Sequence, residues 1–235
     1  MIPNVFPTPV TRTMLDTTTT QRENDARFLF SLAEFHSYEL FIQPDPFIGK
    51  DIGHFHPPLL VGPPQGVLSI DFGRQTNLDS FSVSNAMLQP TSVMSVAVDP
   101  LTRAPIPVFA PVSTDLPMGR EPALNRIIPP PIERPVGTDG ASPMEAQNRA
   151  MARATESSRA IRANGEVDGL KYNRPLLVGL PVSVRGSGNQ YNGTYYVTSV
   201  SHRISRDDYK QSFQAYRNAV GMTGAELYVD PLAAV

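Results

Sequence analysis

Apolar residues near the start of the chain follow a helical spacing that changes abruptly to a strand pattern. Asn24 or Asp25 can cap a helix that ends before Ser37, and the run "YELFI" that follows has the aromatic and branched residues of a strand. The apolar face of the helix comprises Phe28, Leu29, Leu32, Ala33 and His36. We therefore predict a helix over about 24–36 that leads directly into a strand, which favours an α+β domain.

Three later segments show the alternation or the short apolar runs of β-strands. They are "GVLSIDFG", "LDSFSVSNA" and "SVMSVAVD", and each is bounded by Gly, Asn, Pro or Asp. In the third segment, Val96 and Val98 alternate with Ser95 and Ala97. Residues 1–110 are therefore predicted to form a β-rich domain of short antiparallel strands with one helix.

The segment "SPMEAQNRAMARATESSRAIRANG" carries the start and stop signals of a second helix. Ser142 can be the N-cap, Pro143 suits the first helical position, Glu145 completes a capping box, and Gly165 supplies the stop. The predicted buried face is rich in small residues: Met144, Ala150, Met151, Ala154, Ser158 and Ile161. Such a face permits close approach of another backbone, either within the protein or from a neighbouring subunit. The residues from Ala150 onward are therefore a candidate subunit interface.

Alternation in the C-terminal region predicts three strands joined by tight turns. Val182 and Val184 alternate with serine and arginine, and a Gly/Asn-rich turn leads to a second strand that starts near Thr194. One face of this second strand is predicted to hold Tyr196, Thr198, Val200, His202 and Ile204, and the other Tyr195, Val197, Ser199, Ser201 and Arg203. After the turn "SRDD", one face of the third strand is predicted to hold Tyr209, Gln211, Phe213, Ala215 and Arg217. The pattern is that of a β-meander, typical of a small barrel or curled sheet.

Proline divides the chain. Of its 24 prolines, eleven lie between Pro100 and Pro143. Because proline fixes φ and lacks an N–H group, the run "PPPIERP" is excluded from helix interiors and central strands. We predict an extended, partly polyproline-like connector over 111–141, between an N-terminal domain (1–110) and a C-terminal domain (142–235). The expected fold is α+β and mainly β, with two small antiparallel barrel-like domains.

The composition argues against several functional classes. The formal net charge of −2 gives no strong electrostatic footprint for nucleic acid or a membrane surface. The absence of cysteine excludes disulfides, thiolate metal sites and cysteine nucleophiles. Prolines interrupt what would be the apolar stretch of a secretory signal in "MIPNVFPTPVTRTML", and the chain lacks the run of about 18 apolar residues needed to span a membrane.

The segment "HFH" is a candidate for metal chemistry. It places His54 and His56 on one side of an extended segment, with Asp51 nearby as a third potential ligand. Zinc sites need three or four correctly placed ligands, so we favour the alternative of a polar loop before Pro57 and expect no metal or other cofactor.

His202 is the remaining catalytic candidate. A general base needs an orienting carboxylate and a nucleophile within reach. Asp207 and Asp208 lie across the predicted turn, but Ser201 points to the opposite face of the strand. The segment "GSGNQYNG" lacks the Lys-Ser/Thr end of a phosphate-binding loop and is interpreted as a turn. We therefore expect no catalytic residue and no enzymatic activity.

The C-terminal strands nevertheless resemble a known family. The segments "GTYYVTSVSH" and "YKQSFQAYRN" look like the last strands of the phage late control protein D family, the tail hub proteins of contractile phages and related injection systems. The residues that carry the resemblance are Gly193, Tyr196, Val197, Val200, His202, Tyr209, Phe213, Arg217 and Asn218. The helices around 24–36 and from Ser142 resemble that family's helices before its sheets, so the resemblance covers about residues 21–224.

The resemblance implies a structural role in a particle. It implies a homotrimeric hub in the baseplate of a tail or injection system, linking the tail tube protein to the central spike protein. Members of the family usually have a further β-rich segment before the first helix, so we expect those strands to be absent here or to come from another chain. The alternative is a non-catalytic carbohydrate- or surface-binding β-domain of a tail appendage, which exposed tyrosines on a strand would support.

Overall fold

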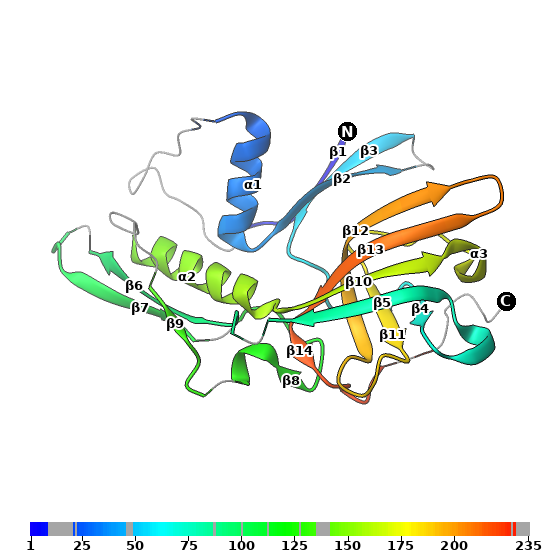
Figure 1. Cartoon of the computed structure of the whole chain (residues 1–235). Helices are drawn as coiled ribbons and strands as arrows, with labels where there is room; N and C mark the ends of the chain where they lie inside the picture. Colours follow the sequence, from blue (N-terminus) through cyan, green and yellow to red (C-terminus); the bar gives the residue numbers. More distant parts are fainter. Residues whose placement is uncertain are drawn as a thin grey trace. The chain divides into compact units, whose positions relative to one another are not determined.

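The chain folds into two compact units, each assembled from three separate stretches of sequence (Figure 1). The computed structural model describes residues 1–8, 21, 23–45, 49–86, 88–99, 101–111, 113–126, 128–134, 142–226 and 228. Unit 1 consists of Met1–Pro58, Thr91–Thr114 and Ile132–Glu156. Unit 2 consists of Leu59–Pro90, Asp115–Pro131 and Ser157–Val235.

These units differ from the consecutive domains that the proline content suggests. Strand β5 (Leu78–Asn85) pairs with β10 (Ile161–Asp168), which lies beyond the proline-rich segment. Proline content shows where a chain cannot form a helix interior or a central strand, but it does not identify the sheet that a strand joins. Sequence on both sides of 111–141 therefore contributes to each unit.

The proline-rich segment itself is more than an extended connector. It contains the short strands β8 (Glu121–Pro122) and β9 (Ile132–Glu133) and the 3-10 helix η2 (Ala123–Asn125). Met118, Ala123 and Leu124 are buried. Part of the predicted connector, residues 135–141, lies outside the described residues.

The first part of unit 1 is a helix followed by a small sheet, as the sequence predicts. Helix α1 (Asp25–His36) begins where the Asn24 side chain accepts a hydrogen bond from the Arg27 backbone N–H at 2.9 Å. Strands β2 (Glu39–Asp45) and β3 (Lys50–His56) form an antiparallel pair, and β1 (Ile2–Val5) joins β3 in parallel. The sheet order is β1-β3-β2.

The second part of unit 1 is a helix lying on one face of a three-stranded sheet. The sheet has the order β7-β6-β9, with β6 (Ser92–Val98) antiparallel to β7 (Pro105–Ala110). Helix α2 (Pro143–Ser158) packs on it through three fully buried alanines, Ala146, Ala150 and Ala154. The predicted N-cap is present, because the Ser142 hydroxyl accepts a hydrogen bond from the Glu145 N–H at 3.3 Å.

Helix α2 ends seven residues before the predicted stop at Gly165. The sequence after Ser158 forms β10 instead, in which Ile161, Ala163 and Val167 alternate inward. β10 is hydrogen-bonded to β5 on one side and β13 on the other, and pairing on both edges outweighs the helical propensity of "RAIRA". Gly165 lies opposite Phe213, where an added Cβ would come within 2.7 Å of the phenylalanine ring.

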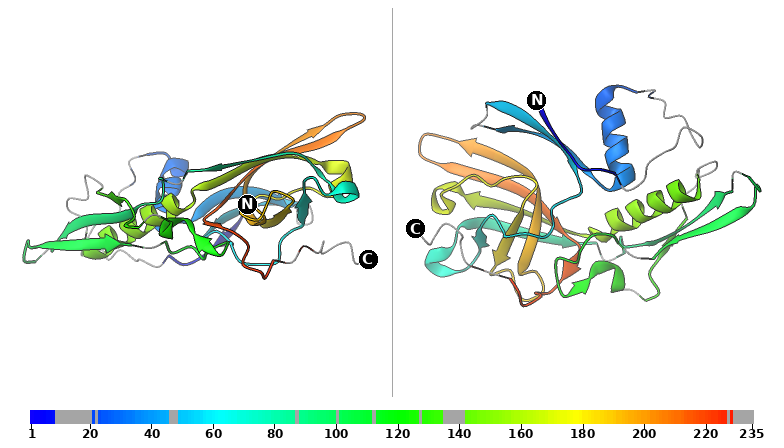
Figure 2. Two further views of the ribbon diagram at one scale, coloured as in Figure 1. Left: turned by 60° about the horizontal axis from the view of Figure 1, so that its bottom comes forward. Right: turned by 180° about the vertical axis from the view of Figure 1, so that it is seen from behind.

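Unit 2 is built on a curled six-stranded sheet with the order β4-β11-β12-β13-β10-β5 (Figure 1). Its remaining strands are β4 (Val67–Ser69), β11 (Pro181–Arg185), β12 (Gly193–Ile204) and β13 (Tyr209–Arg217). The predicted β-meander is thus β11-β12-β13, and Figure 2 shows β12 and β13 running side by side to their turn. Smaller elements are η1 (Gly73–Gln75), α3 (Gly169–Tyr172) and β14 (Ala219–Val220), which pairs with β8.

A β-bulge in β12 changes the predicted sidedness of that strand. The register shifts between Val197 and Ser199, so Val197 opposes Ala215 while Val200 opposes Phe213. Val197 and Val200 therefore pack on the same core, whereas simple alternation places them on opposite faces. The fold as a whole is α+β and mainly β, as predicted. No helix in the described ranges has the length and apolar character required to cross a bilayer.

Candidate functional site

Arg217, at the end of β13, is a fully buried cation. Its guanidinium donates hydrogen bonds of 2.9 Å to three backbone carbonyls, those of Met118, Asn192 and Gly221. It also lies 5.2 Å above the centroid of the Tyr195 ring. The three bonds offset the cost of burying the charge, although the Nε atom of Arg217 has no hydrogen-bond partner among the described residues. One side chain thus joins backbone at residues 118, 192 and 221.

Asn218 extends this connection. Its side-chain oxygen accepts a hydrogen bond from the Met118 N–H at 2.8 Å, and its amide donates to the Leu116 carbonyl at 3.0 Å. Gly193 adopts a φ of +131°, and a Cβ there would lie 3.1 Å from the Arg217 guanidinium. We call Arg217 and Asn218 the buried anchor. Both residues carry the sequence resemblance, and the role of both in this chain is to hold backbone in place.

Tyr195, directly before the motif residue Tyr196, packs with its ring against the Arg217 guanidinium of the buried anchor. It is fully buried, and its hydroxyl donates to the Tyr191 carbonyl at 2.8 Å. Burial raises the pKa of Tyr195 to about 12, against the opposing influence of the Arg217 charge. The phenol therefore stays neutral and serves as a ring face for the cation. Nothing in the sequence pattern distinguishes this tyrosine from its neighbour.

The other motif residues divide between two cores of unit 2. Val197 and Phe213 are buried in the main core, and Val200 packs against it. Tyr196 points to the opposite side, where its ring lies 5.4 Å from that of Tyr216 in a smaller cluster with Leu60 and Met118. The strand pattern at these positions is therefore explained by core packing and not by a catalytic or binding role.

His202 and Tyr209 form an exposed pair near the end of the β12–β13 hairpin. The Nδ1 atom of His202 is 2.8 Å from the Tyr209 hydroxyl, and the two rings are stacked with centroids 6.0 Å apart. Ser201 points to the other face of the sheet, as predicted. The imidazole is thus held by a phenol and not by Asp207 or Asp208, the carboxylates that a catalytic arrangement would use.

Gln211 is an important residue that sequence reasoning did not single out. It is fully buried on β13, where its side-chain oxygen accepts a hydrogen bond from the Leu176 N–H at 2.6 Å. Its amide donates to the Arg174 carbonyl at 2.8 Å. Its position between the inward-facing Tyr209 and Phe213 was the available signal, because a polar residue on a core face needs a partner.

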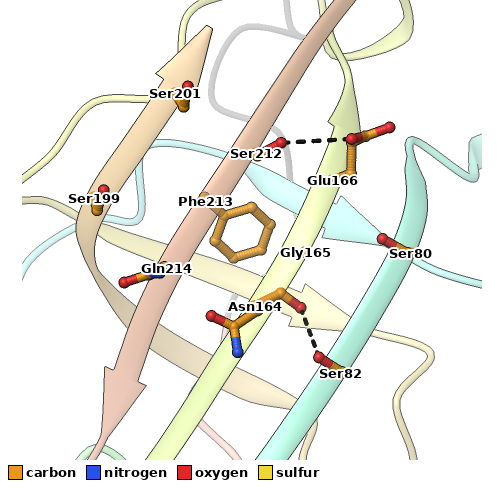
Figure 3. A pocket seen from close by; sticks show the side chains of 10 residues that line it. All are labelled: Ser80, Ser82, Asn164, Gly165, Glu166, Ser199, Ser201, Ser212, Phe213 and Gln214. Carbon is orange, nitrogen blue, oxygen red and sulfur yellow. Dashed lines mark hydrogen bonds between the residues drawn. The ribbon is translucent and has the colours of Figure 1, made fainter.

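The outer face of the six-stranded sheet carries a polar hollow of about 350 Å³ (Figure 3). It extends over four neighbouring strands and is lined by Ser80, Ser82, Asn164, Gly165, Glu166, Ser199, Ser201, Ser212, Phe213 and Gln214. The Ser212 hydroxyl donates to the Glu166 carboxylate at 3.5 Å, and the Ser82 hydroxyl donates to the Asn164 carbonyl at 3.4 Å. Both contacts are long for O–H···O bonds.

These serines are not arranged as nucleophiles. An activated serine needs a close base that is itself oriented by a third group. None of the ten lining residues is a histidine or a lysine, and Glu166, the one carboxylate among them, lies too far from Ser212 for a strong hydrogen bond. The hollow is therefore suited to polar contact, not to covalent chemistry.

A charged cluster at the edge of this sheet joins three of its strands. Lys210 lies 2.6 Å from Asp79 on β5, 3.9 Å from Asp168 at the end of β10, and 3.6 Å from Asp208. The hydrogen bond to Asp79 raises the pKa of the Lys210 ammonium. Asp168 also caps α3, because its carboxylate accepts hydrogen bonds from the backbone N–H groups of Leu170 and Lys171.

The "HFH" segment lies in strand β3 and not in a polar loop, because it pairs along its length with β2. His54 stacks on Phe41 with centroids 4.5 Å apart, and His56 lies 5.4 Å from His54. Burial, and the charge of His56, lower the pKa of His54. Asp51 points to the opposite face because odd and even positions alternate along a strand. Among the described residues no group of three His, Cys, Asp or Glu side chains could hold a metal ion.

The candidate subunit interface on the second helix is largely occupied within the chain. Ala150 and Ala154 face β6 and β7, and Met151 packs at the margin of the same cluster. Ser158 is buried at the helix end, and Ile161 lies in β10 in the core of unit 2. The small residues therefore permit close approach of a sheet of the same protein.

Comparison with known proteins identifies the fold. No protein-family model and no curated protein matches the sequence. The 43 kDa tail protein of prophage MuSo2 from Shewanella oneidensis is 14% identical with a TM-score of 0.58, over 92% of this chain and 59% of that chain. The tail protein from Neisseria meningitidis MC58 is 14% identical with a TM-score of 0.54, over 79% of this chain and 52% of that chain.

A third solved structure, the virion of a native gene transfer agent particle, contains a chain that is 11% identical with a TM-score of 0.42, over 80% of this chain and 38% of that chain. The two tail proteins show that the present chain shares their fold. The chain spans little more than half the length of each of these two proteins.

Proposed function

We propose that the protein is a structural, non-enzymatic subunit of a phage tail or of a phage-derived particle. The observation that carries the proposal is the fold similarity to the MuSo2 tail protein, which extends over 92% of this chain. The buried anchor supports it, because Arg217 and Asn218, two polar residues of the sequence pattern, bind backbone groups within the fold.

Within the particle, we propose the position of a hub. The subunit would form a homotrimer in the baseplate, between the tail tube protein and the central spike protein. The support for this finer assignment is the resemblance of the β12–β13 segment to the hub family. In the fold, the residues of that resemblance contribute to two cores of unit 2, to the buried anchor and to the His202–Tyr209 pair.

The sugar-binding alternative receives less support from the β12 strand. Sugar-binding faces commonly offer exposed aromatic rings, but Tyr195 and Tyr196 are fully buried. The tyrosines in this stretch are therefore better explained as core residues.

The proposed role is tested by locating the protein in purified particles. Mass spectrometry of purified tails should detect it at three copies per tail, and labelling of a tagged chain should mark the baseplate end. Particles that are complete and infectious without the protein would contradict the structural role. Labelling along the tube would contradict the hub position alone.

A further inference from the structure

The sheet of β6, β7 and β9 has a second face that α2 does not cover. The residues on this face oppose each other directly across the ladder, as Met94 with Phe109, Val96 with Pro107, and Val98 with Pro105. Ile132 on β9 extends the same side. We call Met94, Val96, Val98, Pro105, Pro107, Phe109 and Ile132 the outer face of β6–β7. All seven are exposed, and none is charged.

Both faces of this sheet carry apolar residues, unlike those of an ordinary half-buried sheet. Toward α2, strand β6 presents Val93, Ser95 and Ala97, which are buried. Away from α2 it presents Met94, Val96 and Val98, with Val96 49% exposed and Phe109 on the neighbouring strand 50% exposed. A sheet with one buried face normally places its larger apolar side chains on that face, because the gain in free energy follows the apolar area removed from water.

We infer that the outer face of β6–β7 is a contact surface between copies of this chain. The inference deepens the proposed function and rests on it only for the number of copies. The face has no charged side chain to pair with a charged partner, so an occupant must present a similarly uncharged apolar surface. A second copy of the chain presents such a surface.

The area of the face is sufficient for such a contact. With exposed fractions between 36% and 53% for Met94, Val96, Val98, Phe109 and Ile132, the face offers roughly 500 Å² per copy, so a pair of copies in contact through it would bury about 1,000 Å² in total, the lower limit for a specific interface. Twisted sheets pack face to face at about 10 Å through interdigitating side chains of this size. The valine, methionine and phenylalanine side chains of the outer face are long enough to interdigitate in this way, whereas alanine side chains such as those of α2 are too short.

The test uses Val96→Glu and Phe109→Glu in the full chain, followed by native mass spectrometry and analytical ultracentrifugation over a range of concentrations. Burying a carboxylate in an apolar contact should weaken association at least about 100-fold for each variant. Ile204→Glu is the matched control, because Ile204 is an exposed apolar strand residue of unit 2 (77% exposed) outside this face. It should associate like the unmodified protein. Circular dichroism should show that all three variants keep their strand content.

A second measurement avoids the introduction of charge. The chain has no cysteine, so Val96→Cys introduces a single thiol that a short bis-maleimide can link only to another copy. We expect covalent dimers from Val96→Cys and none from Ile204→Cys at the same concentration. Association of Val96→Glu as tight as that of the unmodified protein, or a chain that stays monomeric at every concentration, would overturn the inference. The structural role would survive either result if the protein is still found in purified tails.

Discussion

The main core of unit 2 and the α2 layer of unit 1 bury very different side chains. In unit 2, Leu68, Ile161, Tyr195 and Val197 are each fully buried, within one cluster that spans most of the sheet. In unit 1, the helix–sheet contact is formed mainly by alanine and valine. The first region resembles the interior of an independent domain. The second has a thin core on one side and larger apolar residues exposed on the other.

This difference indicates which contacts stabilise each unit. Complete burial of a large aliphatic or aromatic side chain contributes about 1.5–3 kcal/mol, several times the contribution of an alanine methyl group. Unit 2 therefore stabilises itself within one chain, whereas the α2 layer gains additional apolar burial only when a further surface covers its outer face. Changes in unit 2 should reduce folding stability, and changes on the outer face should reduce association.

The largest expected effect is the loss of the buried anchor in unit 2. Arg217→Ala leaves three carbonyls, one buried and two partly buried, without their donor and opens a cavity above Tyr195. We expect the free energy of unfolding of unit 2 to fall by about 3–5 kcal/mol. Urea denaturation, with hydrogen exchange to assign the transition to β12 and β13, measures this effect.

Arg162→Ala is the control for that substitution. Arg162 lies on β10 in the same sheet, but its side chain is exposed. Its removal should change stability by less than about 0.5 kcal/mol. If Arg217→Ala cost as little as this control, unit 2 would not depend on its buried polar contacts, and the contrast between the units would lose its main support.

The next effect concerns the thin core of unit 1. Ala150 is buried against the sheet with little surrounding space, so Ala150→Leu should destabilise unit 1 by about 1–3 kcal/mol through overpacking. Val96→Ser, on the opposite side of the same sheet, should leave the stability of the monomer almost unchanged. Thermal unfolding of dilute protein separates the two results. Equal losses would mean that both faces of β6 are packed within one chain.

A local effect of similar size is expected at Gln211. Gln211→Ala removes the partners of the Leu176 N–H and the Arg174 carbonyl, with an expected cost of about 1–3 kcal/mol concentrated in the 173–180 loop. The Leu176 amide should exchange with deuterium much faster in the variant. Unchanged exchange at Leu176 would show that the glutamine does not hold this loop. Gln214→Ala, on the exposed face of the same strand, is the matched control.

Local sequence patterns predicted the elements well where one periodicity dominates. The cap at Asn24, the N-cap at Ser142 and the β11-β12-β13 meander were all predicted from short stretches of sequence. The end of α2 was wrong, because the pairing of β10 with two distant strands decided the conformation of residues 161–168. A single sequence contains no direct record of such pairing.

The face of the sheet to which each side chain points was harder to predict than the position of the strands. The bulge at Thr198 places Val197 and Val200 on one face, and nothing in "YVTSV" distinguishes a bulge from regular alternation. The sequence likewise identified Arg217 and Asn218 only through family resemblance. Their carbonyl partners lie up to about a hundred residues away, so the role of the buried anchor emerges only from the folded chain.

The smallest expected effect is a pH dependence at the edge of the unit 2 sheet. Burial raises the pKa of the Asp168 carboxyl, but hydrogen bonds from Lys171 and the charges of Lys210 and Lys171 outweigh it, so this pKa lies below its ordinary value of 3.8. Because the folded state favours the ionised carboxylate, its contribution is complete above about pH 4 and is lost as the pH falls through the lowered pKa. We expect unit 2 to lose less than about 1 kcal/mol from this group between pH 5 and pH 2.5.

Asp168→Asn isolates that charge from the helix cap. An asparagine oxygen can still accept the hydrogen bonds from Leu170 and Lys171, so α3 should keep its N-cap, while the attraction to Lys210 disappears. The variant should therefore show a shallower loss of stability in acid, and added salt should reduce the difference between the two proteins at pH 5. Parallel stability curves for the variant and the unmodified chain would show that the cap, and not the charge, is what Asp168 contributes. The attraction between Asp168 and Lys210 would then have no measurable share in the stability of unit 2, whose edge would keep the closer contact between Lys210 and Asp79.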